Sequence, residues 1–357
     1  MIGSGAVGAS TAWYLAKHGH KVVIIDPLLK KQPTNSQLPL NGTTASLGVL
    51  MGYVFRKSSG RGWRMRKRSM ELWQEWSTLL NTPETPFALN KPLMQLASSE
   101  KEAFIMEKLI NERQGLGLEI FPISPEKKLD RLLPTHKYGG LISTQDGRIN
   151  PLQLQKCLLG ALEKLNVQII CKRVIEIKRG SSTKPRQWYL HLSNKKKIAK
   201  EIIIICAPLS SEALLKPLGY NVPITPILGQ VIDLKLKSDQ KNWSGWPAVL
   251  SHEGINLIPY NQNRLLMGAT LEIGTVASKE KLEQMKSMNG TAPDWLKEAE
   301  IINHWSGLRG RPLNCPAPIL KNLEPGLIIA TGHYRNGILL APASAEWVVN
   351  EVNKIHN

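Results

Sequence analysis

The stretch GSGAVGASTAWYLAKHGHKVVIID, residues 3–26, decides how this chain is expected to fold. It opens with the spacing GxGxxG, and residues 9–18 follow with helix-forming composition and basic side chains in the last turn. Gly19 then stops the helix. The β-branched run at 22–25 predicts a buried parallel strand that ends at Asp26. Together these features predict the turn, helix and strand of a dinucleotide-binding α/β fold.

Each residue of the opening turn has a physical task in holding two phosphates. Gly3 permits the tight turn, Gly5 lets a pyrophosphate approach the backbone, and Gly8 lets helix and strand pack closely. The pyrophosphate is expected at the helix N-terminus, beside Ala6 and Val7, where free N–H groups and the positive end of the helix dipole attract negative charge.

The end of the strand and the start of the chain carry two further expectations. Asp26 is placed to accept hydrogen bonds from ribose hydroxyls, and its carboxylate argues against NADP, because it would repel a 2′-phosphate. Only Met1 and Ile2 precede the glycines, whereas a strand of a sheet normally has about 5–6 residues. We therefore expect that upstream coding sequence completes this strand, and that the chain as it stands binds its cofactor weakly.

Length and composition fit a globular protein of two intertwined domains. The chain has 357 residues, of which 42% are hydrophobic and 21% charged. It contains no apolar run long enough to span a membrane and no secretory signal pattern. The cysteines at 157, 171, 206 and 315 lack the spacing of a zinc site. We expect them to be reduced core thiols of a cytoplasmic protein, and we expect no metal site.

The net charge of +18 raises nucleic acid as a partner. The densest basic patch, within residues 56–68, leads into an expected amphipathic helix, and the lysine triplet at 195–197 is expected at the tip of a hairpin. The favoured interpretation is a solvated basic surface, so no nucleic-acid partner is expected.

The middle of the chain supplies a second candidate phosphate loop and several strands. The loop at 41–48, NGTTASLG, is small and rich in hydroxyls. Thr43, Thr44, Ala45 and Ser46 can therefore give backbone and hydroxyl donors to a phosphate and to a flavin edge. Further on we expect a helix at 152–165, a strand at 167–170, a small antiparallel group over 173–177, 187–192 and 198–206, and a strand buried on both faces at 202–207.

The C-terminal stretch GHYRNGILLAP, residues 332–342, is the second sharp motif. Pro342 suits the first turn of a last helix, whose N-terminus would present free N–H groups. Together with the opening turn, this stretch resembles the FAD-dependent D-amino-acid oxidase (DAO) family. It is most similar to the glycine oxidase branch, which includes enzymes that feed thiamine thiazole synthesis. The resemblance covers nearly the whole chain.

The resemblance implies an α/β fold with two domains. A Rossmann-type (GR2-like) FAD-binding domain would be assembled from residues 1–85, 145–212 and 300–357. An α+β substrate domain with a mixed sheet would comprise residues 86–144 and 213–299. Because Cys315 does not lie in the motif that attaches FAD covalently in some relatives, noncovalent FAD is expected.

The resemblance also assigns roles to single residues. Arg309 matches the arginine that holds the substrate carboxylate, a task that suits the guanidinium fork. Arg335 would lie at the flavin and the substrate. Asn256 stands where glycine oxidases usually have a tyrosine over the substrate, so it is a candidate polar contact. The resemblance implies further cofactor-binding residues in the middle of the chain and in the C-terminal motif, namely Val174, Gly332, Asn336, Gly337, Ile338 and Leu339. The N–H groups of Gly337, Ile338 and Leu339 would face the flavin N1–C2=O edge.

The implied function is oxidation of a small amino acid or amine, with a hydride passing from Cα to flavin N5 and O2 reoxidising the flavin to give H2O2. Alignment and charge stabilisation suffice for such a step, so no general base is demanded. A thiazole synthase is a candidate partner, and a homo-oligomer remains open. One alternative is a D-amino-acid dehydrogenase that passes electrons to a quinone or another acceptor. A second is a non-catalytic basic flavoprotein that binds RNA or a protein partner.

Overall fold

A mostly parallel sheet, with one antiparallel edge strand, joins the two ends of the chain. The computed structural model describes residues 1–29, 41–113, 115–122, 133–134, 137–181, 187–237, 243 and 245–356. Ile2 forms parallel bridges to Ile25 on one side and Ile205 on the other, so it occupies the central strand position. The strands, in sheet order around Ile2, are β8 (Gln168–Ile170), β1 (Val23–Ile25), β12 (Ile203–Ile205), β20 (Leu327–Thr331) and β19 (Ile319–Glu324).

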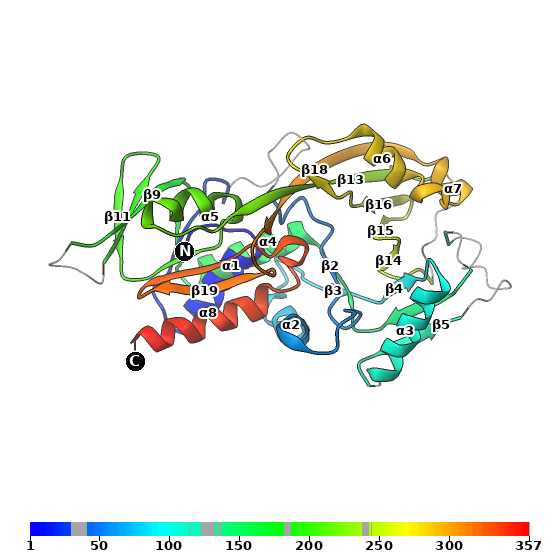
Figure 1. The fold of residues 1–357 in the computed structure, drawn as a ribbon, viewed down its shortest axis with the longest axis horizontal. Helices are drawn as coiled ribbons and strands as arrows, with labels where there is room; N and C mark the ends of the chain where they lie inside the picture. Colours follow the sequence, from blue (N-terminus) through cyan, green and yellow to red (C-terminus); the bar gives the residue numbers. More distant parts are fainter. Residues whose placement is uncertain are drawn as a thin grey trace.

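Helices from three distant parts of the sequence pack beside this sheet. The opening helix α1 (Ala6–Lys17) contacts α4 (Pro151–Lys164) and the last helix α8 (Ala341–His356), which in turn contacts α2 (Gly60–Leu80). Figure 1 shows α1 between α4 and α8. The expected last helix is confirmed, with Pro342 at its second position. The packing of sequence-distant helices around one sheet agrees with a Rossmann-type domain built from separate segments.

A three-stranded antiparallel sheet branches off between β8 and β12, as expected. It consists of β9 (Val174–Arg179), β10 (Trp188–Leu192) and β11 (Lys197–Lys200), followed after β12 by α5 (Pro208–Leu215). The lysine triplet begins at Lys195, which has a φ of +65° in the turn between β10 and β11. The expectation of a basic hairpin tip is therefore confirmed.

The second large unit is a mixed sheet of nine strands. Its two longest strands, β13 and β18, pair antiparallel and extend across the upper part of Figure 1. The strands are β17 (Glu272–Ile273), β13 (Ile224–Lys235), β16 (Arg264–Gly268), β15 (Ile255–Asn261), β14 (Val249–His252), β4 (Leu93–Leu96), β6 (Gly140–Ser143), β5 (Leu118–Phe121) and β18 (Glu300–Pro312), of which β18 pairs with β13 beside the main path. The fold class, an α/β domain with a mixed-sheet α+β unit, is as expected; the domain boundaries stay a prediction.

The two faces of this sheet meet different cores. Ile232, Leu257 and Met267 point to an outer core that also contains Met285 of α6 (Lys279–Lys286) and Leu296 of α7 (Asp294–Lys297). Their strand neighbours point the opposite way, because side chains alternate along a strand. We call that opposite side the inner face. Its members Val231, Val249, Ile258 and Leu266 belong to the same core as residues of α1, α2, α4 and α8.

A small sheet lies between these two units. It is formed by β2 (Val49–Leu50), β7 (Gly147–Ile149) and β3 (Leu89–Asn90), in the order β2–β7–β3. Just before β7, the carboxylate of the fully buried Asp146 accepts hydrogen bonds from the backbone N–H groups of Gly52, Tyr53 and Val54, at 2.7–3.1 Å. Because no other acceptor serves these amides in the described chain, Asp146 holds the turn after β2 in place.

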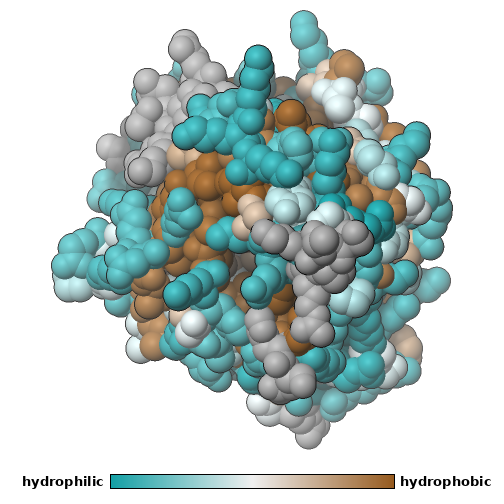
Figure 2. Space-filling view, turned by 90° about the vertical axis from the view of Figure 1, so that its left-hand side faces the viewer, coloured by the Kyte–Doolittle hydropathy of each residue, from teal (hydrophilic) through white to brown (hydrophobic). Residues whose placement is uncertain are grey.

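The surface carries most of the basic charge, and α2 begins in the basic patch. Within that patch Arg56, Lys57, Arg61, Arg64 and Lys67 are exposed. Figure 2, which views the β9–β11 end, shows a mostly hydrophilic surface around an apolar area. None of the helices in the described part of the chain has the length and apolar character needed to cross a bilayer.

The cysteines require one correction. All four are free, and Cys157 and Cys206 are buried as expected, but Cys171 and Cys315 are exposed. Cys171 directly follows β8, and Cys315 lies in the connection from β18 to β19. Connections run over the surface, because a buried one would leave backbone polar groups unsatisfied. These two thiols are therefore not part of a core.

The Asp146 anchor can be tested by replacement. Asp146→Ala should lower the free energy of unfolding by about 3 kcal/mol, because several buried amides lose their acceptor. Asp294→Ala is the control: that side chain is 89% exposed, and its loss should cost within about 0.5 kcal/mol. Urea denaturation of the two variants measures the difference, and equal values would contradict the anchor.

Candidate active site

The opening turn has the geometry expected of a phosphate-binding turn. Gly3 has a φ of +98°, which favours glycine, and a Cβ there would lie 2.9 Å from the carbonyl oxygen of Cys206. A Cβ on Gly8 would lie only 2.0 Å from the carbonyl oxygen of Gly3. The N–H groups of Gly5, Val7 and Gly8 donate no hydrogen bond to a described residue. The start of α1 therefore offers several free donors in one place, which fits a pyrophosphate.

The hydroxyl-rich loop at 41–48 lies against this turn. The Oγ1 of Thr43 accepts a hydrogen bond from the N–H of Ala6 at 2.8 Å, so the Thr43 hydroxyl proton remains available to a phosphate oxygen. The N–H groups of Thr43 and Thr44 both donate to Oδ1 of Asn41, at 2.9 Å. The hydroxyl of Ser46 donates to the Thr43 carbonyl. The loop thus contributes a hydroxyl, while the amides of Ala6, Thr43 and Thr44 are already in use.

Two further predicted cofactor residues lie at the ends of neighbouring strands. Asp26 accepts hydrogen bonds from the N–H groups of Ser4 and Leu28, each at 2.8 Å. Its carboxylate keeps lone pairs for a ribose, since a carboxylate has about four acceptor sites. Val174 is buried at the start of β9 and shares an apolar cluster with Ile25 of β1, which places it beside the strand that carries Asp26.

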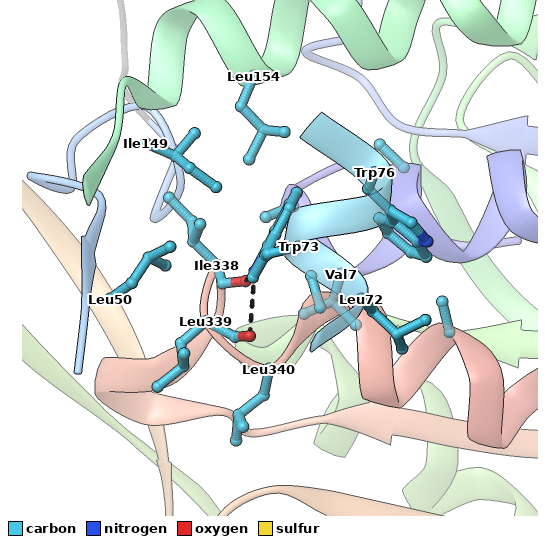
Figure 3. Close-up of a cluster of buried hydrophobic side chains, with 14 of the residues drawn as sticks. Val7, Leu50, Leu72, Trp73, Trp76, Ile149, Leu154, Ile338, Leu339 and Leu340 are labelled. Carbon is cyan, nitrogen blue, oxygen red and sulfur yellow. Dashed lines mark hydrogen bonds between the residues drawn. The ribbon is translucent and has the colours of Figure 1, made fainter. Parts of the chain in front are cut away.

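The segment before α8 presents three free amides. The N–H groups of Gly337, Ile338 and Leu339 donate no hydrogen bond to a described residue. On the opposite side, the indole N–H of the buried Trp73 donates to the carbonyl oxygens of Ile338 and Leu339, at 3.2 Å each (Figure 3). Because C=O and N–H point opposite ways in a trans peptide, Trp73 turns the Leu339 N–H away from the core. These amides can face a negatively charged flavin edge.

The other residues of the C-terminal motif hold this segment in shape. Gly332 has a φ of +64°, and the carbonyl oxygen of Asn336 accepts from the N–H of Leu340 at 2.9 Å. His333 is buried, and its Nε2 bonds to the Ser344 hydroxyl at 2.8 Å. Burial lowers the pKa of His333 to about 3, so the ring is neutral near neutral pH. His333 is a structural member of the motif.

Arg309 lies on the inner face of the large sheet. It pairs with Ile227 of β13, and its guanidinium lies over Gly229, where a Cβ would come 2.2 Å from Nη1. Nη1 donates to the carbonyl oxygens of Leu228 and Thr270, at 3.3 and 3.2 Å. Burial, and then the positive charge of Arg335, lower the pKa of Arg309, which nevertheless stays charged near neutral pH. No described carboxylate forms an ion pair with it.

A buried polar network fixes the segment that receives Arg309. The side chain of Gln230 donates to Glu272 at 2.9 Å and to the Ser278 carbonyl at 2.8 Å. Thr270 bonds to the same carboxylate, and its Oγ1 accepts from the Gln230 N–H at 2.8 Å. Burial raises the pKa of Glu272, but hydrogen bonds from Thr270, Gln230 and Ser278 outweigh it and leave the pKa lowered. The ionised network thereby holds the Thr270 carbonyl in place.

Asn256 lies on the same inner face as Arg309. Its register partner is Gly268, and its Nδ2 donates to the Gly268 carbonyl at 3.2 Å. Its Oδ1 is shielded from water, yet it accepts no hydrogen bond from a described residue. Gly268 and Thr270 are two residues apart, so Asn256 and Arg309 bond to one short segment. Tyr260 lies four residues further along β15, where the pairing with β16 shifts in register, and it is 42% exposed.

Arg335 is exposed on the short turn before α8. Its charge acts on Arg309, as does the ring of its neighbour Tyr334, so the two predicted arginines are near one another. Sequence reasoning missed Gln230, Thr270 and Glu272 as support for this site. The Gly229–Gln230 pair gave a weak signal, whereas the network itself depends on strand register.

Comparison with known proteins agrees with this geometry. The sequence profile of the family described as FAD dependent oxidoreductase (DAO) matches residues 1–351. A glycine oxidase of Pseudomonas aeruginosa is 33% identical over 160 residues, 43% of this chain and 42% of that protein. The bifunctional protein ThiO/ThiG of Nostoc sp. is 25% identical over 98% of this chain and 52% of its own length. The chain thus spans about two fifths to a half of these relatives. The crystal structure of glycine oxidase from Bacillus cereus shares the fold, with a TM-score of 0.81 and 22% identity over 99% of this chain and 94% of that one.

The fold, the two sets of free amides and the partly buried Arg309 are those of a dinucleotide-dependent oxidoreductase. The chain belongs to the DAO family of FAD-dependent oxidoreductases. The expected family, fold and FAD dependence are thereby confirmed.

The close contact at Gly8 gives a direct test of the FAD turn. Gly8→Ala should reduce bound flavin at least about tenfold, because its Cβ collides with the Gly3 carbonyl and displaces the turn. Gly160→Ala in α4 is the matched control: a Cβ there meets nothing within 4 Å, so flavin content should not change. The ratio of flavin to protein absorbance after gel filtration with excess FAD measures both.

Proposed function

We propose that the protein oxidises a small amino acid or amine at the carbon that bears the nitrogen. The observation that carries the proposal is Arg309: a partly buried guanidinium on the inner face, held by two carbonyl oxygens and without an ion-pair partner in the described chain. A buried charge of this kind is costly unless a ligand neutralises it. A carboxylate matches the planar fork with two parallel hydrogen bonds.

The residues on the inner face would orient the substrate. Arg309 would fix the carboxylate, and the unpartnered Oδ1 of Asn256 would accept a hydrogen bond from the amine. Arg335, close to Arg309, would add positive potential at the same place. The role of the protein is then to align the Cα–H bond, an effect that can lower a barrier by about 7–11 kcal/mol.

FAD would supply the two-electron acceptor, taking a hydride at N5 and later giving the electrons to oxygen. The free amides at Gly5, Val7 and Gly8 and the Thr43 hydroxyl would hold its phosphates, with Asp26 and Val174 toward the adenosine side. Those of Gly337, Ile338 and Leu339 would face the flavin ring. The rest of the 43–46 loop, Thr44, Ala45 and Ser46, would border the cofactor.

Oxygen as the acceptor and a thiazole synthase as the partner are also part of the proposal. The ThiO/ThiG relative supports the idea that a product imine passes to a second enzyme. Anaerobic titration with glycine, sarcosine and D-amino acids should bleach the flavin absorbance for at least one of them. In a separate aerobic assay, peroxide formed in equal amount to substrate consumed would identify an oxidase, and its absence a dehydrogenase. A flavin that no amine bleaches would contradict the proposal.

The role of Arg309 can be tested by the dependence of flavin reduction on amino-acid concentration. Arg309→Gln should raise the amino-acid concentration for half-maximal anaerobic flavin reduction roughly a hundredfold, since a charge-assisted hydrogen-bonded pair is lost at about 3 kcal/mol. Flavin content should remain, because the guanidinium does not bond to the FAD turn. Arg64→Gln, an exposed arginine of α2, is the matched control. An unchanged half-saturation in Arg309→Gln would exclude Arg309 as the carboxylate ligand.

A further inference from the structure

A second arginine, Arg148 of β7, is more deeply buried than Arg309. Its register partners are Val49 of β2 and Asn90 of β3. The neighbouring Ile149 points to the main core, where it packs with Leu50 near Trp73 (Figure 3). By alternation, the side chain of Arg148 leaves the small sheet on the opposite face. Arg148 is therefore not a residue of the main apolar core.

Among the described residues, Arg148 has no partner for its charge. The residue is only 6% exposed. Its Nε is shielded from water and without a hydrogen bond, and its terminal nitrogens donate to no described residue. Arg113, also buried, leaves its Nε unbonded as well, but its terminal nitrogens donate to two carbonyl oxygens and its guanidinium stacks on Trp63 at 3.9 Å. Burial lowers the pKa of Arg148 to about 10, so it is charged at neutral pH.

The face on which Arg148 lies adjoins the candidate active site. The chain just before β2 packs on the inner face of the large sheet: the Ala45 carbonyl accepts from the Trp305 indole at 3.0 Å, and a Cβ on Gly268 would lie 3.1 Å from Leu47. Gly268 is the partner of Asn256. Tyr260, four residues further along the strand of Asn256, lies close enough to Arg148 for an ionised Tyr260 to raise the pKa of that arginine.

We propose that Arg148 binds a second anionic group of the substrate, a carboxylate, while Arg309 holds the first. This rests on the proposed function of Arg309. An unpaired buried charge is destabilising, and a carboxylate that takes it up recovers that cost upon binding. A monocarboxylic substrate such as glycine would leave Arg148 unpaired. The protein should therefore prefer amino acids or amines with two acidic groups over neutral ones of similar size.

Ligand binding to the FAD-loaded protein tests this inference without requiring catalytic turnover. Acetate and propionate, and the dicarboxylates malonate, succinate and glutarate, are titrated while the flavin spectrum is followed. The unsubstituted protein should bind at least one dicarboxylate about tenfold or more tightly than the monocarboxylates. Arg148→Gln should abolish this preference and leave monocarboxylate binding within about twofold, whereas Arg309→Gln should weaken both classes.

The outcomes are distinguishable. Equal affinity of the unsubstituted protein for both classes would overturn the role of Arg148 even if Arg148→Gln failed to fold. So would an equal loss of both classes in Arg148→Gln. Monocarboxylates that bind independently of Arg309 would instead refute the proposed function. Arg64→Gln, with a solvated guanidinium, should behave as the unsubstituted protein, and kcat/KM for D-aspartate against D-alanine should follow the ligand preference.

Discussion

The close packing of the opening turn on itself and on the backbone after β12 is the constraint on which the rest of the structure depends. Gly8 touches the carbonyl of Gly3, and Gly3 touches the backbone after β12, at distances that exclude any side chain. This contact brings α1 down onto the sheet and leaves its first amides without partners. Because these donors point out of the end of a helix, the fold itself creates a site for negative charge, before any side chain is considered.

Hydrogen bonds from two tryptophans fix the position of segments that lie far along the chain from the opening turn. Trp73 of α2 holds the carbonyls before α8, so the free amides of that segment turn outward from the main core. Trp305 of β18 bonds to Ala45 in the hydroxyl-rich loop, so the loop that borders the opening turn also touches the inner face. The phosphate turn and the inner face are thus linked through hydrogen bonds of two indoles, of which Trp73 is fully buried and Trp305 partly buried; an indole N–H needs a partner once it is shielded from water. The placement of the candidate catalytic residues follows from this linkage.

Local patterns sufficed for the parts of the fold that depend on short stretches. The glycine spacing, the helix stop at Gly19 and the proline of the last helix each predict one element, and the structure contains them. The expectation of core thiols is wrong for Cys171 and Cys315, because composition does not say which connections reach the surface. The candidate site is harder to predict from the sequence. The motif around Arg309 indicated its role, but its support by Gln230 and Thr270 depends on the pairing of β13 with strands 30 to 80 residues away. Arg148 gave no signal, since an arginine in a short polar stretch is usually a surface residue.

The inner face of the large sheet is surrounded by unpaired positive charge. Arg309, Arg335 and Arg148 bring three positive charges to the region around the inner face, and none of them forms an ion pair with a described carboxylate. Elsewhere the protein does pair its arginines: Arg68 with Glu346, Arg179 with Glu324 and Arg264 with Asp233. The ionised Glu272 acts on Arg309 from a distance but forms no ion pair with it, so part of the positive charge in this region stays unpaired among the described residues. If the proposed function holds, such a site would select its substrate by acidic groups first, and the position of those groups would decide which carbon faces the flavin.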